Sequence, residues 1–385
     1  MSAVTAVFSS LCPLVIRMSQ TNWAFYIAMQ AGVVPVAESS PGQGKTAVCR
    51  AMAAATKRRF LQVILSQKLR EDIGGVPVPR TIDIDGEEHE CVMSLMPEEL
   101  VRATNEPSIV LLDELNHASH DVLGAAQEII NNPPDLCWMG AFMNPIEQST
   151  SGVELAPPVI NRVCMLQWER HIDERRAGWA NGFTHFPAPE FPIVPPDFLL
   201  DFGPKWGQLL CMFEESMPQH FDPEETYPKD ESAAIRPWRS DRSWTNAGIL
   251  LAACEAAGGS KATASKLVRG CVGDGPAMEF LAWVDKQRLP TPESILANPT
   301  SWQVPRRFDL ARAMIAGCIG VAKRENDPET WESLMDLNEH IFSQRRELAV
   351  SCHGAVWKAK PSGYEPRIRA GISQEMAELI VGASA

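Results

Sequence analysis

The sequence predicts an α/β fold in which a five-stranded parallel sheet is followed by a mainly α-helical domain. Over residues 23–167, short apolar runs alternate with stretches of helical periodicity. This alternation is typical of parallel strands that are covered by helices on both faces. After residue 238, apolar residues recur at helical spacing between breaks rich in glycine and proline, which predicts a second, helical domain.

The elements of the sheet domain follow from these runs. Residues 45–56 are rich in alanine and are expected to be helical. Residues 121–131 place Val122, Ala126, Ile129 and Ile130 on one helical face, so a second covering helix is expected there. We expect the strands at residues 33–37, 60–65, 109–112, 138–143 and 163–167.

Changes in composition predict the domain boundaries. Proline steps recur between residues 187 and 237, and because they disfavour helices they predict a linker or irregular insertion. The end of the chain is expected to be either a docking arm or a solvated tail. The predicted segments are an N-terminal segment (1–22), the α/β domain (23–167), the linker (168–237), the helical domain (238–350) and the tail (351–385).

Composition and charge narrow the class of protein. A formal net charge of −13 over 385 residues argues against a general nucleic-acid binder, because such a protein needs a basic face. The ten cysteines stand singly, without a CxxC pair, so we expect small buried thiols such as Cys164 and no zinc site. The N-terminal apolar stretch has no preceding basic region and no unbroken apolar span, so we expect an unanchored, cytoplasmic protein.

A phosphate-binding loop is predicted between the first strand and the first helix of the domain. Residues 38–46 read Glu-Ser-Ser-Pro-Gly-Gln-Gly-Lys-Thr. Its two glycines allow consecutive N–H groups to turn toward a phosphate chain, Lys45 is expected to reach the β and γ phosphates, and Thr46 is expected to ligate Mg²⁺. Ser39 stands where the general pattern has glycine. The residues expected to bind ATP are Ser40, Pro41, Gly42, Gln43, Gly44, Lys45, Thr46 and Ala47.

The apolar run at residues 109–112 ends in two acids, Asp113 and Glu114. A central strand that ends in this way delivers carboxylates to the sheet edge where phosphates bind. Asp113 is expected to hold Mg²⁺, and Glu114 is expected to polarise the water that attacks the γ-phosphate. Without the preceding phosphate loop, the same pair would be an ordinary helix cap about half the time.

Two further residues are candidates for the same site. Asn144 follows the predicted strand at residues 138–143 and is expected to sense the γ-phosphate, although an Asn-Pro step alone favours a simple turn. Arg162 precedes the last predicted strand and is a candidate arginine finger for a neighbouring subunit, with a surface ion pair as the alternative.

The order of these motifs resembles the MoxR group of AAA+ ATPases. The resemblance rests on Ser-Pro-Gly-Gln-Gly-Lys-Thr, Leu-Leu-Asp-Glu-Leu-Asn-His-Ala, Met-Asn-Pro and Pro-Pro-Val-Ile-Asn-Arg-Val. His117 departs from the family, which has arginine at this step. The segment Ser-Asp-Arg-Ser-Trp at residues 240–244 is similar to the one that carries the family's second sensor, which indicates Arg242, with Arg236 and Arg239 as competitors.

The resemblance implies an AAA+ P-loop core with a helical lid, and a ring, usually a hexamer, that binds ATP between subunits. It also implies a chaperone-like motor that remodels a partner protein, commonly one with a von Willebrand A domain. A nucleic-acid-directed motor and the motor subunit of a metal chelatase are the alternative functions. Residues 76–96 are expected to form a hairpin or loop that faces the pore of the ring, or else a solvated hairpin.

Overall fold

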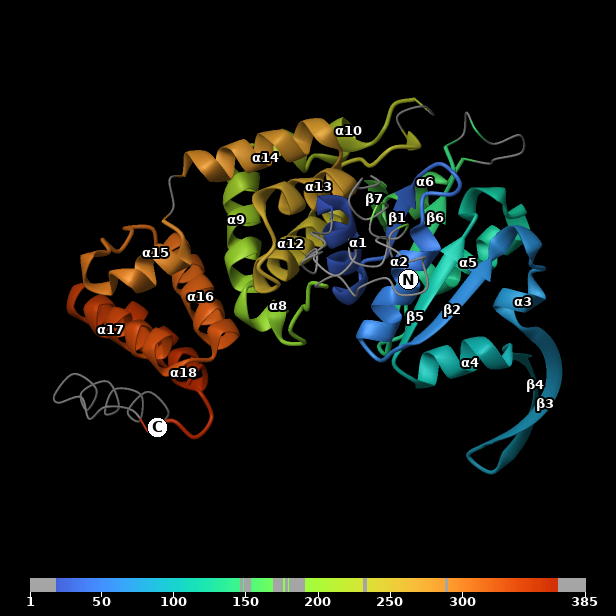
Figure 1. The fold of residues 1–385 in the computed structure, drawn as a ribbon, viewed down its shortest axis with the longest axis horizontal. Coiled ribbons are helices and arrows are strands. Elements are labelled where there is room, and N and C mark those ends of the chain that lie inside the picture. Colours follow the sequence, from blue (N-terminus) through green and yellow to red (C-terminus); the bar gives the residue numbers. More distant parts are fainter. Residues whose placement is uncertain are drawn as a thin grey trace, which may run out of the picture. The chain divides into compact units, whose positions relative to one another are not determined.

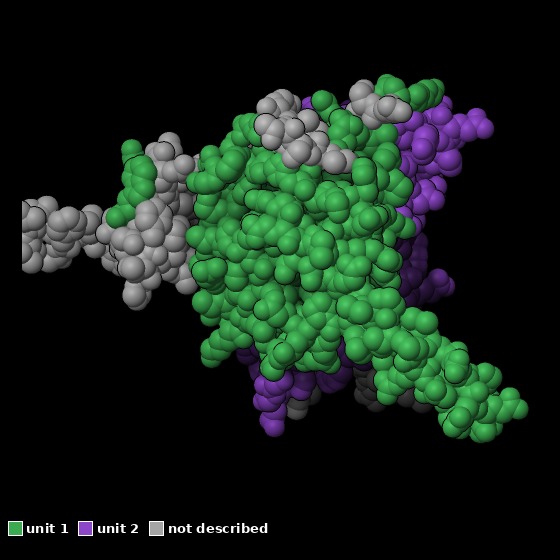
Figure 2. Space-filling view, turned by 90° about the vertical axis from the view of Figure 1, so that its right-hand side faces the viewer, with its two compact units in different colours: residues 1–193, 229–237 green, residues 194–228, 238–385 purple. Residues whose placement is uncertain are grey.

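The chain forms two compact units in the computed structural model (Figure 2). The first comprises residues 1–193 and 229–237, and the second comprises residues 194–228 and 238–385. The structure describes residues 19–145, 148, 154–168, 176, 179, 191–230, 234–287 and 290–365. The first unit contains the parallel sheet, and the second is mainly helical, as the sequence predicts.

The sheet of the first unit has five parallel strands in the order β2-β5-β6-β1-β7 (Figure 1). Each strand overlaps a run expected from the sequence, so the predicted fold class is confirmed. In the centre of the sheet Ala37 lies between Phe142 and Leu166. The strands are β1 (Pro35–Glu38), β2 (Arg59–Ile64), β5 (Ser108–Asp113), β6 (Cys137–Met143) and β7 (Cys164–Gln167).

Helices cover both faces of this sheet because its strands are apolar on both sides. Residues of α4 and α5 pack into one core with Val110, Leu112 and Met139. On the other face the Phe25 ring of α1 stacks on Phe142, with ring centroids 4.9 Å apart. Gly140 leaves room for this ring, since a Cβ there would lie 2.6 Å from it. The covering helices are α1 (Gln20–Gln30), α2 (Lys45–Ala55), α4 (Glu98–Asn105) and α5 (His120–Asn131).

The first unit begins earlier than the sequence predicts. Residues 1–22 were expected to be a separate N-terminal segment, but α1 already begins at Gln20. The Ser19 hydroxyl caps this helix by accepting a hydrogen bond from the Asn22 N–H at 3.1 Å. Because Phe25 and Tyr26 are fully buried, α1 belongs to the core of the sheet domain.

The expected hairpin is present. Strands β3 (Val76–Ile84) and β4 (Glu87–Leu95) follow the short helix α3 (Glu71–Gly74) and pair antiparallel. Asp85 and Gly86 form the two-residue turn, with φ of 56° and 87°. Figure 1 shows the pair extending away from the sheet as a curved ribbon.

The second unit is a helical domain with two buried clusters. Phe213, Trp244 and Phe280 form the centre of an aromatic cluster in its first half. Trp331 and Leu334 lie in the second cluster. The helices are α8 (Phe198–Asp201), α9 (Gly203–Ser216), α10 (Pro223–Thr226), α12 (Asp241–Ala256), α13 (Lys261–Val272), α14 (Asp274–Lys286), α15 (Pro292–Ala297), α16 (Phe308–Glu325), α17 (Pro328–Gln344) and α18 (Arg346–Lys358).

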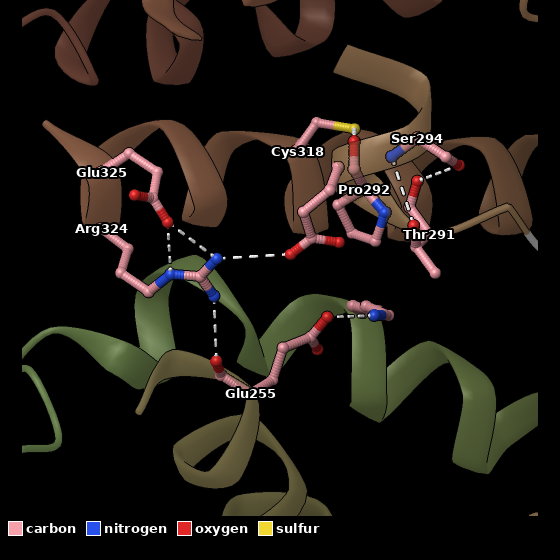
Figure 3. A network of polar contacts seen from close by, with 9 residues as sticks. Glu255, Thr291, Pro292, Ser294, Cys318, Arg324 and Glu325 are labelled. Carbon is pink, nitrogen blue, oxygen red and sulfur yellow. Dashed lines mark hydrogen bonds and ion pairs between the residues drawn. The ribbon is translucent and has the colours of Figure 1, made fainter. Parts of the chain in front are cut away.

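A polar network joins three helices of this unit (Figure 3). The guanidinium group of Arg324 on α16 donates to the Glu255 carbonyl of α12 at 3.1 Å and to the carboxylate of Glu293 on α15 at 3.3 Å. The Cys318 thiol lies 3.8 Å from the Pro292 carbonyl. These contacts tie the two halves of the helical unit together.

The expectation of an irregular linker over residues 168–237 is wrong for its second half. Residues 198–226 form α8, α9 and α10, and Phe213 of α9 is fully buried in the second unit. Pro204 and Pro223 stand in the first turns of their helices, where the missing N–H has no intrahelical partner to lose. The part of the predicted linker at residues 180–190 lies outside the described residues.

The predicted tail also begins too early, because α18 continues past residue 351 to Lys358. Residues 366–385 lie outside the described residues. Cys164 is buried, as expected, and burial raises the pKa of the Cys137 thiol to about 11. Within the described ranges, no helix combines the length and the apolar character that crossing a bilayer requires.

Candidate active site

The strand order brings three predicted segments to one edge of the sheet. Strands β5, β6 and β1 are parallel neighbours, so the residues that follow them emerge at the same edge. After β1 the chain continues to β2, which lies to one side of β1 in the strand order, whereas β7 lies to the other side. Ligands of open α/β sheets bind at such a reversal of strand order.

The loop after β1 has the backbone conformation that the sequence predicts. Gly42 and Gly44 have φ of 73° and 76°, in the left-handed region that favours glycine. A Cβ at either position would meet nothing within 4 Å, so backbone conformation and not space requires glycine here. Ser39 lies outside the left-handed region, which explains why this position does not need the glycine of the general pattern.

The loop leads directly into α2, whose first turn faces outward from the sheet edge. The residue before the helix is Gly44, which has no side chain that could accept hydrogen bonds from the first N–H groups. These donors and the positive end of the helix dipole are therefore available to an anion.

Lys45 is the buried cation of this site. Its side chain is 8% exposed, and Nζ donates to the Ser39 carbonyl at 3.1 Å and to Asn144 Oδ1 at 3.3 Å. Burial lowers the pKa of Lys45, and the carboxylates of Asp113 and Glu114 raise it in part. The predicted neighbours Lys45 and Asn144 are thus in direct contact in the first unit.

The two acids after β5 are held by residues of the β2 segment. The Gln62 side-chain amide donates to Asp113 Oδ2 at 2.9 Å, and the Ser66 hydroxyl donates to Glu114 Oε2. The Glu114 N–H donates to Asp113 Oδ1 at 3.0 Å. Glu114 itself has φ of 57°, an uncommon conformation for a side chain of this kind. Both carboxylates are therefore oriented before any ligand binds.

The sequence reasoning missed the structural role of Asn116. This fully buried side chain donates to the Asn144 carbonyl at 2.8 Å and accepts from the Asn144 N–H at 3.2 Å. It therefore fixes the backbone of the residue that contacts Lys45. The signal in the sequence was an amide two residues after the acidic pair, but its partner lies 28 residues away and could not be read from spacing.

Removing this side chain is expected to destabilise the first unit. Asn116→Ala should lower the free energy of unfolding by about 2 kcal/mol, because the N–H and C=O of Asn144 lose a shared buried partner. Urea unfolding measures this change. Asn105→Ala on α4 is the matched control, since the hydrogen bonds of that exposed amide go to the Val101 carbonyl and the Thr104 hydroxyl of its own helix, and its loss should cost below about 0.5 kcal/mol. Equal stability of the two variants would contradict the role given to Asn116.

A comparison with protein-family models finds a match within the first unit. Residues 40–136, from the phosphate loop to the start of β6, match the family model of the AAA domain (dynein-related subfamily). The first unit contains an AAA+ P-loop domain. The comparison with curated proteins found no match.

The chain is similar to a solved structure at low sequence identity. One is a crystal structure from Cytophaga hutchinsonii, described as that of a "putative ATPase", with 14% sequence identity and a TM-score of 0.42. The similarity covers 69% of this chain and 88% of that one. At this TM-score the likeness carries no functional inference.

Two predicted site residues are not brought to the AAA+ site by the fold of the first unit. Arg162 lies between α6 (Pro157–Ile160) and β7. Since Cys164 pairs with Pro35 at the start of β1, Arg162 stands at the amino-terminal edge of the sheet, opposite the phosphate loop. Arg242 is exposed in the first turn of α12, in the second unit.

The competitors of Arg242 differ in their surroundings. Arg239 donates to His220 Nδ1 at 3.2 Å and to the Glu225 carbonyl at 3.3 Å, all within the second unit. Arg236 is exposed. Arg239 is therefore held by its own unit, whereas Arg236 and Arg242 present their guanidinium groups to solvent.

Proposed function

We propose that this protein is an Mg²⁺-dependent ATPase that works as a MoxR-type AAA+ remodelling motor. The observation that carries the proposal is the convergence of Lys45, Asn144 and the Asp113-Glu114 pair at one edge of the sheet. A purely structural role does not account for a buried cation beside two neighbouring carboxylates. Phosphate chemistry uses all of them.

The residues fit the nucleotide and its metal. Lys45 has three donors, and among the described residues two acceptors lie within hydrogen-bond distance of its Nζ, so one donor remains for a phosphate. The backbone of residues 40–47 would hold the phosphate chain, and Thr46 and Asp113 would hold Mg²⁺. When bound, Mg²⁺ neutralises negative charge on the phosphates.

Glu114 is the residue best placed to act on the attacking water. Its carboxylate is oriented by Ser66 through Oε2 and stands next to Asp113, so we assign proton transfer to the other oxygen, Oε1. Asn144, which Asn116 fixes in place, orients groups around the γ-phosphate together with Lys45. We therefore assign nucleotide binding and proton transfer to different residues.

The position of Arg162 supports a ring. It stands at the sheet edge opposite the phosphate loop of its own chain, so an arginine finger at this position would act on the nucleotide of a neighbouring subunit. We propose a hexamer in which Arg162 acts in trans and Arg242 contacts nucleotide from the lid. The proposed client is a protein, such as one with a von Willebrand A domain, and the net charge of −13 favours a protein over nucleic acid.

One experiment tests ATP hydrolysis and the ring together. The wild-type protein should release phosphate from ATP in the presence of Mg²⁺, and this release should stop when EDTA removes the metal. Arg162→Ala should lower turnover by at least about tenfold, with a much smaller change in ATP affinity, because the finger stabilises charge only during reaction.

Mixing two impaired variants tests whether Arg162 acts on the nucleotide of a neighbouring subunit. Arg162→Ala subunits keep their phosphate loop, and Lys45→Ala subunits keep their finger, so a mixed ring restores complete sites. Turnover of the mixture should exceed the sum of the two separate variants. A mixture that is no more active than its components would place the finger elsewhere, whereas absence of wild-type turnover would contradict the ATPase proposal itself.

A further inference from the structure

The β3–β4 ribbon has two chemically different faces. Directly opposite residues of an antiparallel pair share a face, and the register pairs Val76 with Leu95 and Val78 with Met93. The face that carries these four also carries Ile82 and Ile84, and near the turn it includes Arg80, Glu87, His89 and Cys91. The other face carries the acids Asp83, Glu88 and Glu90 together with Thr81, Ser94, Val92 and the two prolines.

The apolar face is exposed in the described part of the chain. Ile84 is 50% exposed, Val76 is 50% exposed and Leu95 is 53% exposed. Large exposed side chains gathered on one face of a ribbon are typical of a surface that another chain covers. A two-stranded ribbon is also marginally stable by itself, so a third strand would add to its stability.

Two prolines determine which edge of the ribbon can accept that strand. Pro77 and Pro79 lie within β3 and lack an N–H, so they occupy positions that do not hydrogen-bond to β4. Their partners in the register, Ser94 and Val92, therefore have backbone groups that point away from β3. By the same alternation, the N–H and C=O groups of Glu88 and Glu90 also point outward.

The outer edge of β4 is thus an open row of donors and acceptors. Glu88, Glu90, Val92 and Ser94 are all exposed, and none of them has a further backbone partner among the residues that the structure describes. The corresponding edge of β3 lacks donors at Pro77 and Pro79. Exposed strand edges of this kind pair with extended peptides.

We infer that the outer edge of β4 takes up an extended segment of a partner protein as a third strand, whose residues alternate between apolar and basic. Its apolar side chains would lie beside Met93 and Leu95, and its basic side chains beside Glu88 and Glu90. This inference does not depend on the proposed ATPase activity. It assigns a partner-binding site to the ribbon.

Charge favours a basic partner over a second copy of this chain. Two β4 edges that pair with each other would gather the carboxylates of Glu88 and Glu90 from both copies along one short ribbon. Like charges at neighbouring cross-strand positions are destabilising. Lysine or arginine in the added strand pairs with the same carboxylates instead.

Peptide binding to the full chain tests the inference. The probe is a fluorescein-labelled peptide of the sequence Gly-Lys-Val-Lys-Val-Lys-Val-Lys-Gly, and fluorescence anisotropy measures its affinity. Val92→Pro removes one outward N–H without touching a hydrogen bond to β3, and should weaken binding by about tenfold or more. Thr81→Pro is the matched control, because it removes an outward N–H from the edge of β3 and should leave the affinity unchanged.

Further measurements distinguish backbone pairing from other causes of a change in affinity. Val92→Ala keeps the N–H and should bind like the wild type, and a peptide with glutamate in place of lysine should bind at least about tenfold more weakly. On binding, hydrogen exchange at Glu90 and Val92 should slow, whereas exchange at Cys91 should change little, because its N–H already pairs with β3.

Several results would overturn the inference. They are equal affinity of wild type and Val92→Pro, equal loss in Thr81→Pro, no preference for the lysine peptide, or no binding of that peptide at all. A concentration-dependent dimer that Val92→Pro abolishes would make a second copy of the chain the occupant. Gel filtration of the wild type and Val92→Pro detects that case.

Discussion

Replacing Glu114 with glutamine is expected to lower ATP turnover by about two or more orders of magnitude while ATP still binds. Glutamine preserves the shape of the side chain and can still accept a hydrogen bond from Ser66, but it cannot take a proton from the attacking water. Lys45, Thr46 and Asp113 are untouched by this change. The variant should therefore retain nucleotide, and an assembly that depends on ATP should persist.

Phosphate release and binding of a fluorescent ATP analogue measure the two halves of this prediction. Glu99→Gln is the matched control, because Glu99 is exposed on α4 and is not one of the proposed site residues, so its turnover should equal that of the wild type. Wild-type turnover in Glu114→Gln would refute the assignment of the base. Because the variant holds ATP, it is also the suitable bait for a client that dissociates after hydrolysis.

Replacing Lys45 with methionine is expected to weaken both ATP binding and ATP turnover. ATP affinity should fall by about ten- to a hundredfold, since a buried charge-assisted hydrogen bond to phosphate is lost, and turnover should fall by about two orders of magnitude or more. Methionine retains an apolar stem beside the Phe142 ring, over which the ammonium group lies at 5.4 Å. The variant should therefore fold.

Calorimetric titration with ATP and Mg²⁺ checks the loss of affinity, and circular dichroism checks the fold. Lys68→Ala removes an exposed ammonium group and should change neither quantity. Undiminished ATP affinity in Lys45→Met would mean that nucleotide binds elsewhere. Lys45→Met and Glu114→Gln together distinguish a lost binding site from a lost base, because only Lys45→Met should lose affinity for ATP.

Much of the candidate site could be predicted because its signals are local. The phosphate loop depends on Gly42 and Gly44, whose left-handed conformations follow from residue type. The acids Asp113 and Glu114 follow a run of buried apolar residues that is recognisable as a central strand. Parallel pairing then brings these segments to a common edge, so Lys45, Asn144 and the acids meet as expected.

The contacts that orient these residues could not be predicted from spacing. Gln62 holds Asp113, Ser66 holds Glu114 and Asn116 holds Asn144. The first pair joins strands β2 and β5, and the second joins the segments that follow these two strands. Helix α9 was missed for a related reason. Its Pro204 suggested a break, but a buried aromatic cluster around Phe213 stabilises the helix that follows it.

The class of fold and the conformation of the glycine loop at residues 38–46 could be predicted from the chain alone, because backbone conformation at glycine and the burial of short apolar runs are local properties. Tertiary contacts determine which polar side chains orient the acids and Asn144, and at which sheet edge Arg162 stands. Those facts follow from the order β2-β5-β6-β1-β7, which places residues distant in the chain side by side. Strand order arises from the packing of the whole sheet, and no short segment encodes it.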